Sequence, residues 1–372
     1  MSVQVATREA TSGAMSATSE MSAREFGAVI ARLISGCDLT REQAYESFRQ
    51  ILLDRQSEMQ QGAFLAALAA KGESAGEIAG IWQAIYEHDT MRVNVRTRVP
   101  LVENCGSGMD TIKTFNISTA AALIAAADNV PIARHGSRAI TSACGTVDIL
   151  EALGVNVECS VETVKKSIEV AGIGLFNGMS ARVHPHALGR VLSQISFGSV
   201  LNIAASLANP AMPKVAVRGT SSRDLLVPTA QAMREIGYTR ALVVYGEGEP
   251  GMPGGIDEAS TMGRTFVCEL GSDGSLRQFS FSVTELGLQR ARAVELAISG
   301  NALIEASRMK SLLMGRETSA RTDIACLNAG LILYVAGRQL TIKAGLEAAL
   351  ELVATKRPIN KLIDWINVQK GD

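Results

Sequence analysis

Apolar residues recur at the spacing of helices over residues 25–90 of the chain. In the first segment they occupy positions i, i+3, i+4 and i+7, one face of a helix: Phe26, Val29, Ile30 and Leu33. Thr40 followed by Gln43 forms a capping-box pattern that predicts the start of a second helix. Ser74 followed by Glu77 predicts another helix start in the same way. We interpret this region as a small helical bundle whose role is packing.

The pattern changes after Val99, where short β-branched runs lead into glycine-containing loops and alternate with helical segments. These runs lie at residues 130–133, 214–217 and 241–245. Such alternation predicts a larger α/β domain with a mostly parallel central sheet flanked by helices. Apolar and polar residues alternate over residues 279–283, which predicts a half-exposed antiparallel strand near the edge. Because ligands bind outside the carboxyl ends of parallel strands, we expect the glycine-rich loops to carry the chemistry.

Composition narrows the class of protein. Of the 372 residues, 47% are hydrophobic and 20% are charged, and the formal net charge of −1 gives no attraction to nucleic acid or to an anionic membrane. No apolar run approaches the roughly 20 residues that a membrane helix needs. The six cysteines are scattered without a CxxC pair, which is typical of reduced thiols in a cytoplasmic protein. Residues 1–22 lack both a secretory pattern and lasting periodicity, so we expect a flexible tail.

Three segments carry residues suited to binding anions or metal. The first runs from Cys105 to Asp110 and continues through Thr114–Thr119 into an alanine-rich helical run. Glycines allow close approach of the backbone, and a helix N-terminus offers unpaired N–H groups, so the segment suits a phosphate. An ordinary strand-to-helix turn capped by serine explains the same residues equally well.

The second segment, Arg134–Arg138, is followed by Thr141, Ser142, Gly145 and Asp148. It either holds a second anion through its cations or forms a solvated basic loop. The third segment ends in Asp257 and Glu258, adjacent carboxylates that can provide oxygen ligands to Mg²⁺ or simply be surface charge.

In their order and spacing these segments resemble the anthranilate phosphoribosyltransferases, within the wider family that includes pyrimidine nucleoside phosphorylases. That family carries a GTGGD-type loop, TFNIST, KHGNR, SS..GS.D leading into LEALG, and GLDE. The corresponding segments are residues 106–110, 114–119, 134–138, 141–148 leading into 150–154, and 255–258. The helical segments 39–45 and 71–80 and the C-terminal segment 327–331 match as well, so the resemblance extends from about residue 25 to the C-terminus.

The resemblance implies that the protein transfers ribose 5-phosphate from phosphoribosyl diphosphate (PRPP) to anthranilate or a related aromatic amine or N-heterocycle, with Mg²⁺ and release of diphosphate. The protein's task is then to position two substrates and stabilise the leaving charge, so we assign no single catalytic residue. The implied donor-binding residues are Gly106, Ser107, Gly108, Asp110, Thr114, Asn116, Ser118, Thr119, Arg134 and Thr146. The implied metal-binding residues are Ser118, Asp257 and Glu258.

The resemblance also implies a domain division and a homodimer joined through the helical domain. The helical domain is expected to comprise residues 23–95 with about 187–207. The α/β domain that binds PRPP is expected to comprise residues 98–186 and 208–372.

The acceptor side departs from the family pattern. The implied acceptor-binding residues are His135, Ser137, His184 and Arg190. Ser137 replaces an asparagine, and Arg134, on the donor side, replaces a lysine, which changes donor geometry. The stretch from residue 184 to 202 is two residues shorter and lacks the Val-Arg-Arg pattern whose arginine grips the acceptor carboxylate, so Arg190 is the nearest candidate. Residues 204–210 lose a Gly-Pro beside the acceptor, and Met109 replaces a glycine beside the phosphate site.

Departures concentrated on one pocket indicate a different acceptor, a weakened enzyme or a retired one. A non-catalytic family member that binds nucleic acid or a regulatory ligand is therefore the alternative interpretation. The near-neutral charge disfavours nucleic acid, because counterion release requires clustered lysine and arginine. Phosphorolysis of nucleosides is disfavoured because the lysine-containing phosphate motifs of that branch do not occur in the sequence.

Overall fold

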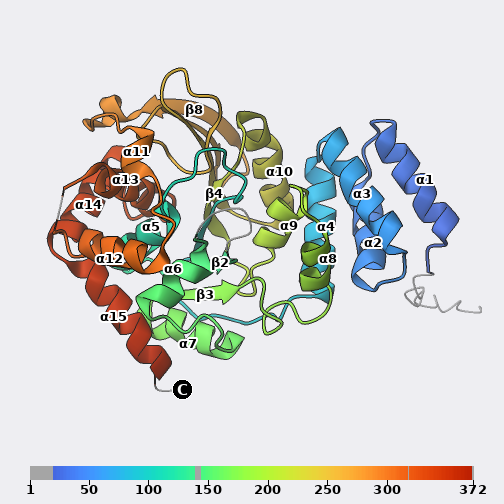
Figure 1. Ribbon diagram of the computed structural model, residues 1–372, viewed down its shortest axis with the longest axis horizontal. Coiled ribbons are helices and arrows are strands. Elements are labelled where there is room, and N and C mark those ends of the chain that lie inside the picture. The colour runs from blue at the N-terminus through green and yellow to red at the C-terminus, as the bar shows by residue number, and fades with distance from the viewer. Residues whose placement is uncertain (1–19, 139–143, 317, 371–372) are drawn as a thin grey trace, which may run out of the picture.

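The computed structural model of the chain describes residues 20–138, 144–316 and 318–370, so most of the predicted tail and the candidates Thr141 and Ser142 lie outside the described residues. Figure 1 shows a helical bundle beside a larger part in which helices surround a sheet. The bundle contains α1 (Ala23–Ile34), α2 (Arg41–Leu52), α3 (Glu58–Lys71), α4 (Ala75–His88), α8 (Leu188–Gln194) and α9 (Leu201–Leu207).

The bundle forms as its sequence predicts. Both capping boxes are present, with Thr40 and Gln43 at the start of α2 and Ser74 and Glu77 at the start of α4. The apolar faces meet in one core, to which α1 contributes Phe26 and α3 contributes Phe64, with ring centroids 5.6 Å apart. The late helix α9 joins α4 through a hydrogen bond of 2.9 Å from Trp82 Nε1 to Leu207 O. Residues more than a hundred positions apart therefore share this bundle.

The sheet is mixed and mostly parallel, as predicted. Its strand order is β3-β2-β1-β4-β5-β7-β8, and the short β6 pairs with β5. The parallel strands are β1 (Val102–Cys105), β2 (Ile132–Gly136), β3 (Ile173–Asn177), β4 (Val215–Gly219) and β5 (Arg240–Glu247). The antiparallel strands are β6 (Gly255–Ile256), β7 (Arg264–Leu270) and β8 (Leu276–Ser282). The edge strand expected at residues 279–283 is thus β8.

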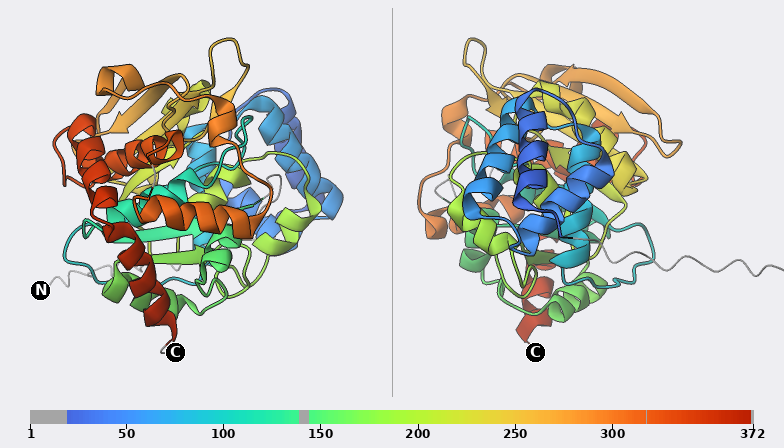
Figure 2. Two further views of the ribbon diagram at one scale, coloured as in Figure 1. Left: turned by 60° about the vertical axis from the view of Figure 1, so that its left-hand side comes forward. Right: turned by 90° about the vertical axis from the view of Figure 1, so that its right-hand side faces the viewer.

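Helices cover both faces of this sheet. One face carries α5 (Ile117–Ala126), α6 (Thr146–Leu153), α12 (Ala302–Leu313), α13 (Ala320–Val335), α14 (Ile342–Ala354) and α15 (Arg357–Lys370) around a common core. The opposite face packs against α10 (Leu226–Ile236), α9 and α4, which join the sheet to the bundle (Figure 2). Shorter elements complete the chain: α7 (Val161–Ala171), α11 (Ala293–Leu296) and the 3-10 turns η1 (Arg223–Leu225) and η2 (Val283–Leu286).

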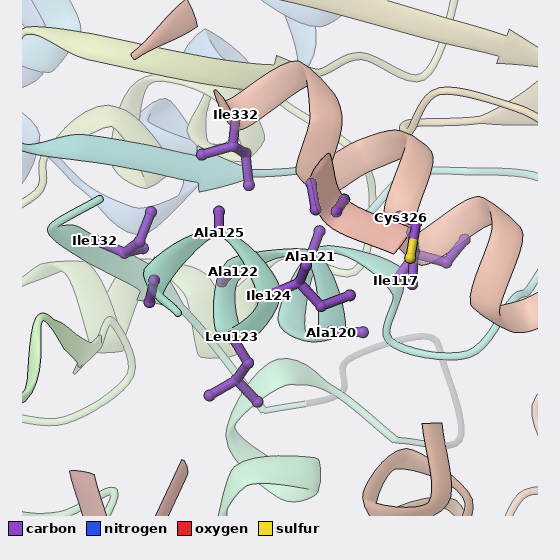
Figure 3. Close-up of a cluster of buried hydrophobic side chains, with 14 of the residues drawn as sticks. Ile117, Ala120, Ala121, Ala122, Leu123, Ile124, Ala125, Ile132, Cys326 and Ile332 are labelled. Carbon is purple, nitrogen blue, oxygen red and sulfur yellow. The ribbon is translucent and has the colours of Figure 1, made fainter. Parts of the chain in front are cut away.

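Small residues allow α5 and α13 to pack closely in the centre of the α/β part. Figure 3 shows the alanines of α5 between α13 and β2, with Ile132, Cys326 and Ile332 around them. A Cβ atom added to Gly330 of α13 would lie 2.6 Å from the backbone nitrogen of Leu346, so α14 also approaches very closely. This tight packing fixes α5, whose N-terminus points to the carboxyl end of β1. None of the described helices is long and apolar enough to cross a membrane.

Candidate active site

The glycine turn after β1 and the acidic couple Asp257–Glu258 meet at one place. Ser107 Oγ and the backbone nitrogen of Gly108 both donate to Asp257 Oδ2, at 3.0 and 2.7 Å. A Cβ atom on Gly106 would lie 2.5 Å from the same oxygen, so glycine is required for this approach. The segments are about 150 residues apart in sequence, yet they share a site as the phosphate-and-metal hypothesis requires.

Glu258 lies at the N-terminus of α5. The backbone nitrogen of Ser118 donates to Glu258 Oε1 at 3.1 Å. Asn116 precedes the helix without a capping hydrogen bond from its side chain, which leaves the N-terminal N–H groups to other acceptors. Carboxylates therefore occupy both groups of backbone donors that could bind phosphate.

The loop that carries the couple is clamped by α13 and β4. Asn328 receives a hydrogen bond from Ala259 N and donates one to Ala259 O, both at 2.9 Å. A Cβ atom on Gly219, the last residue of β4, would lie 1.7 Å from Asp257 O, so any side chain there would displace the loop. The match at residues 327–331 thus has a physical role, since it positions the acidic couple.

Negative charge accumulates in this region. Burial, followed by the charge of Asp257, raises the pKa of Glu258 to about 8. Burial and Asp257 also raise the pKa of Asp110 to about 6, although Lys113 opposes the shift from 3.2 Å. Adjacent carboxylates in a site of low polarity repel each other when ionised, and a cation relieves that repulsion.

The available ligands are oxygen atoms, the kind of ligand that Mg²⁺ takes in proteins. No group of three or more histidine, cysteine, aspartate or glutamate side chains with metal-binding geometry occurs among the described residues. Magnesium fits such a site because it is commonly held by one or two carboxylates and keeps waters and substrate phosphates as its other ligands. Asp257, Glu258 and the Ser118 hydroxyl are oxygen donors of the required kind.

Arg134 lies beneath the same helix N-terminus. Its guanidinium is buried in β2 and donates to Thr119 Oγ1 and, at 2.9 Å, to Ser118 Oγ. Burial lowers the pKa of Arg134, with nearby negative groups opposing this effect. Its bidentate geometry orients both hydroxyls of the TFNIST segment, so it acts on the donor site through these side chains as well as by its charge.

The other predicted donor residues surround this centre without joining the carboxylate network. Thr114 forms a bridge with Ala297, and Asn116 Nδ2 donates to Cys144 O at 3.1 Å. Thr146 begins α6, where its Cγ2 atom would lie 3.0 Å from a Cβ on Gly136. A small cavity opens beside the couple, lined by Asn104, Cys105, Ser118, Val217, Gly219, Glu258, Asn328 and Ile332.

On the acceptor side the structure brings His135 and His184 together. Their Nε2 atoms are 3.1 Å apart and their rings are T-shaped. His135 Nδ1 faces Ser206 O at 3.1 Å, and His184 Nδ1 faces Asp89 O at 2.6 Å. Because carbonyl oxygens only accept, each Nδ1 carries a proton and each Nε2 is left as an acceptor. Burial, followed by the neighbouring His184, lowers the pKa of His135 to about 3, and burial also lowers the pKa of His184.

The structure does not bring Arg190 to this histidine pair. Its guanidinium binds Gln61 Oε1 at 3.0 Å and Ile51 O at 2.8 Å, and it lies 3.3 Å from Asp54. All of these partners belong to the helical bundle. Ser137 follows β2 and its carbonyl oxygen accepts from Val147 N at 3.2 Å, close to the start of α6.

Sequence reasoning missed Arg218, a fully buried arginine in β4 that lies near the histidines. It donates to Asn202 O at 2.9 Å and to Ser206 Oγ. The available signal was a charged residue directly after the β-branched run that ends at Val217, because buried parallel strands rarely carry charge without a role.

Comparisons with known proteins agree with this architecture. Residues 98–356 match the family model "Glycosyl transferase family, a/b domain", and residues 28–89 match "Glycosyl transferase family, helical bundle domain". The chain is 33% identical over 344 residues to anthranilate phosphoribosyltransferase of Roseiflexus sp. (strain RS-1), covering 92% of this chain and 97% of that protein. It is 35% identical over 325 residues to the enzyme of the same name from Halorubrum lacusprofundi, covering 87% and 86%.

Solved structures give the same result. The crystal structure of anthranilate phosphoribosyltransferase from Thermus thermophilus superposes with a TM-score of 0.82 at 33% identity, covering 92% of this chain and 99% of that one. The Saccharomyces cerevisiae enzyme, solved in complex with PRPP and Mg, shares the fold with a TM-score of 0.81 at 20% identity, covering 95% and 100%.

Proposed function

We propose that this chain, which belongs to the anthranilate phosphoribosyltransferase family, transfers ribose 5-phosphate from PRPP to an aromatic amine and releases diphosphate. The observation that carries the proposal is the meeting of the Gly106–Asp110 turn, the N-terminus of α5 and the acidic couple in one site. Relatives at 33–35% identity carry the name of this activity, and one related structure contains PRPP and Mg.

The donor site works by exchanging partners. In the structure, Gly108 N and Ser118 N donate to Asp257 and Glu258. With donor bound, these N–H groups would pair with diphosphate oxygens, and Asp257 and Glu258 would provide carboxylate oxygens to Mg²⁺. Bound Mg²⁺ supplies positive charge that stabilises the leaving diphosphate. Arg134 holds the Ser118 and Thr119 hydroxyls toward the same site and adds its own charge.

The acceptor amine is received by the histidine pair. The Nε2 atoms of His135 and His184 are acceptors in a buried environment, which suits the N–H groups of an aromatic amine. The lowered pKa of each imidazole keeps the pair neutral at pH 7, so the pair does not repel the oxocarbenium-like ribose. Ser137 and Arg190 remain predictions as acceptor residues, and the partners of Arg190 in the bundle do not support its role.

A turnover assay tests the proposal. Purified protein with PRPP, Mg²⁺ and a panel of aromatic amines and N-heterocycles should release diphosphate. Asp257→Asn and Glu258→Gln should abolish release, whereas Asp273→Asn, which removes an exposed carboxylate from the β7–β8 turn, should not. Absence of turnover with every acceptor, together with absence of donor binding, would remove the proposal.

Assembly and location also remain proposals. The bundle exposes Ile34 of α1 and Met59 of α3, with 73% and 86% of their surfaces accessible, which is consistent with a homodimer formed through this domain. Light scattering that returned a monomer mass would contradict the dimer. We further propose that the helical domain comprises residues 23–95 with about 187–207, and that the α/β domain comprises residues 98–186 and 208–372. We also propose a cytoplasmic location.

A further inference from the structure

Arg218 has hydrogen-bond donors without partners in the interior of the protein. The residue is 2% exposed, and its Nη2 donates to Asn202 O and Ser206 Oγ. Its Nε and Nη1 atoms have no hydrogen-bond partner among the described residues, and no ion pair within 4 Å formed by those residues includes it. A buried guanidinium with unpaired N–H groups is costly for folding, so a ligand that pairs with it would recover that cost.

The sheet places this guanidinium in line with the histidine pair. Cys105 pairs with Arg218 across β1 and β4, and Cys105 Sγ lies 3.3 Å from His135 O of β2. Arg218 and His135 also share a partner in α9, since the hydroxyl of Ser206 accepts from Arg218 and its carbonyl faces His135 Nδ1. The three residues therefore form one row on the face of the sheet that meets α9.

This row lies next to the donor turn. Asn202 Nδ2 donates to Ser107 O at 3.5 Å, while its own carbonyl oxygen accepts from Arg218. A molecule between Arg218 and the histidines would consequently adjoin the glycine turn at Ser107, where we propose that the donor binds. Arg190 cannot provide the cation from its observed position, because it is held by Gln61, Ile51 and Asp54.

We infer that Arg218 is the specificity-determining residue for the acceptor and binds the anionic group of an acidic aromatic amine, an aminobenzoate-type molecule. The inference rests on the proposed transferase function and deepens it. Free N–H groups of the guanidinium meet the carboxylate in charge-assisted hydrogen bonds, and the histidine Nε2 atoms accept from the amine. Ser206 is a positioning residue, because it holds Arg218 and His135 together.

The experiment compares acids with their uncharged amides. Binding of 2-aminobenzoate and 4-aminobenzoate, and of the two corresponding amides, is measured by calorimetry with diphosphate and Mg²⁺ in the donor site. The wild-type protein should prefer at least one acid over its amide by about 10- to 100-fold, the effect of charge-assisted hydrogen bonds. Arg218→Met should reduce that preference to less than about threefold while the affinity for diphosphate is unchanged. No preference in the wild type, or an undiminished preference in Arg218→Met, would overturn the inference.

Two further measurements keep the test decisive. Arg218→Met should melt no lower than the wild type, because an apolar side chain of similar length replaces an incompletely paired buried charge. If that variant fails to fold, Arg218→Lys takes its place, and it should weaken the acid preference without removing it. Loss of the preference in Arg190→Met instead of the Arg218 variant would assign recognition to Arg190 and overturn the inference. Because binding is read without turnover, failure of phosphoribosyl transfer is distinguishable from failure of this assignment.

Discussion

The donor side and the acceptor side of the site differ in whether carboxylates of the chain accept hydrogen bonds from their N–H groups. On the donor side, the N–H groups of Gly108 and Ser118 are taken by the acidic couple, and Arg134 holds two hydroxyls. On the acceptor side, two imidazole Nε2 acceptors face each other, and Arg218 has unpaired donors. Carboxylates accept from the donor-side N–H groups, whereas no ion pair formed by the described residues includes Arg218 on the acceptor side. The donor side keeps most of the family motifs, with Arg134 and Met109 as its departures, whereas Ser137 and the segments 184–202 and 204–210 depart on the acceptor side.

The largest expected effect comes from adding a side chain to Gly219, where β4 touches the backbone of Asp257. Gly219→Ala would place a Cβ atom 1.7 Å from Asp257 O and push the carboxylates away from the glycine turn. We expect about 100-fold weaker donor binding or turnover, because misplacement of about 1 Å is enough for such a loss. Calorimetry with PRPP and Mg²⁺ measures it. In Gly62→Ala, where nothing lies within 4 Å of the added atom, donor binding should be normal and the helix slightly more stable.

A smaller loss is expected when Arg134 becomes lysine, the residue that the family pattern contains. Arg134→Lys keeps the charge but loses one of the two hydrogen bonds to Ser118 and Thr119. The affinity for PRPP should fall by about 10-fold, the value of one charge-assisted hydrogen bond. Titration of PRPP into both proteins checks this, with Arg277→Gln on exposed β8 as a control. Equal or tighter binding by the lysine variant would show that bidentate geometry at residue 134 is unimportant.

The next prediction concerns pH and the donor side alone. The folded-state pKa of Glu258 lies above its ordinary value of 4.5, at about 8, so its protonated form stabilises the free protein. This contribution is complete below pH 4.5 and is lost as pH rises through about 8. Glu258→Gln should therefore flatten the decline of thermal stability between pH 5 and 8. The same shift implies that Mg²⁺ with PRPP displaces a proton at pH 7, which calorimetry in buffers of different ionisation enthalpy detects. Wild-type stability that rises over this range would contradict the assignment.

The smallest effect should arise where the bundle supports the acceptor side. Trp82→Phe removes the hydrogen bond from Trp82 Nε1 to Leu207 O at the end of α9. The free energy of unfolding should fall by about 1 kcal/mol, the usual value of one such bond. Because α9 carries Ser206 and Asn202, KM for the acceptor should rise while donor affinity is unchanged. A change in donor affinity without a change in KM for the acceptor would contradict the division between the donor side and the acceptor side.

Local patterns predicted much of the fold. The capping boxes of α2 and α4, the apolar runs that became β4 and β5, and the edge strand β8 depend on short-range periodicity. Strand β1 escaped prediction because it contains Glu103 and Asn104, polar residues that occur rarely in buried strands. Their partners are distant in sequence, since Glu103 accepts from Asn209 and Tyr238, and Asn104 donates to Ser118 O. Such partners cannot be read from a local pattern.

The residues of the candidate site were likewise predicted only where a motif identified them. The convergence of the glycine turn and the acidic couple was expected from the resemblance to a family, and no local spacing required it. Arg218 was missed because its importance depends on neighbours brought together by the sheet and by α9. Arg190 was chosen as the arginine nearest to the missing Val-Arg-Arg pattern, and the structure shows that its guanidinium binds the helical bundle instead.

The most direct test of the central claim is a calorimetric titration of PRPP, with and without Mg²⁺, into the wild-type protein and into Asp257→Asn/Glu258→Gln. We expect binding to the wild type to depend on Mg²⁺ and to be lost in the double variant, because Asp257 and Glu258 are the carboxylates that would hold the metal beside the donor-binding N–H groups. Binding of equal strength to both proteins, or binding indifferent to Mg²⁺, would contradict it.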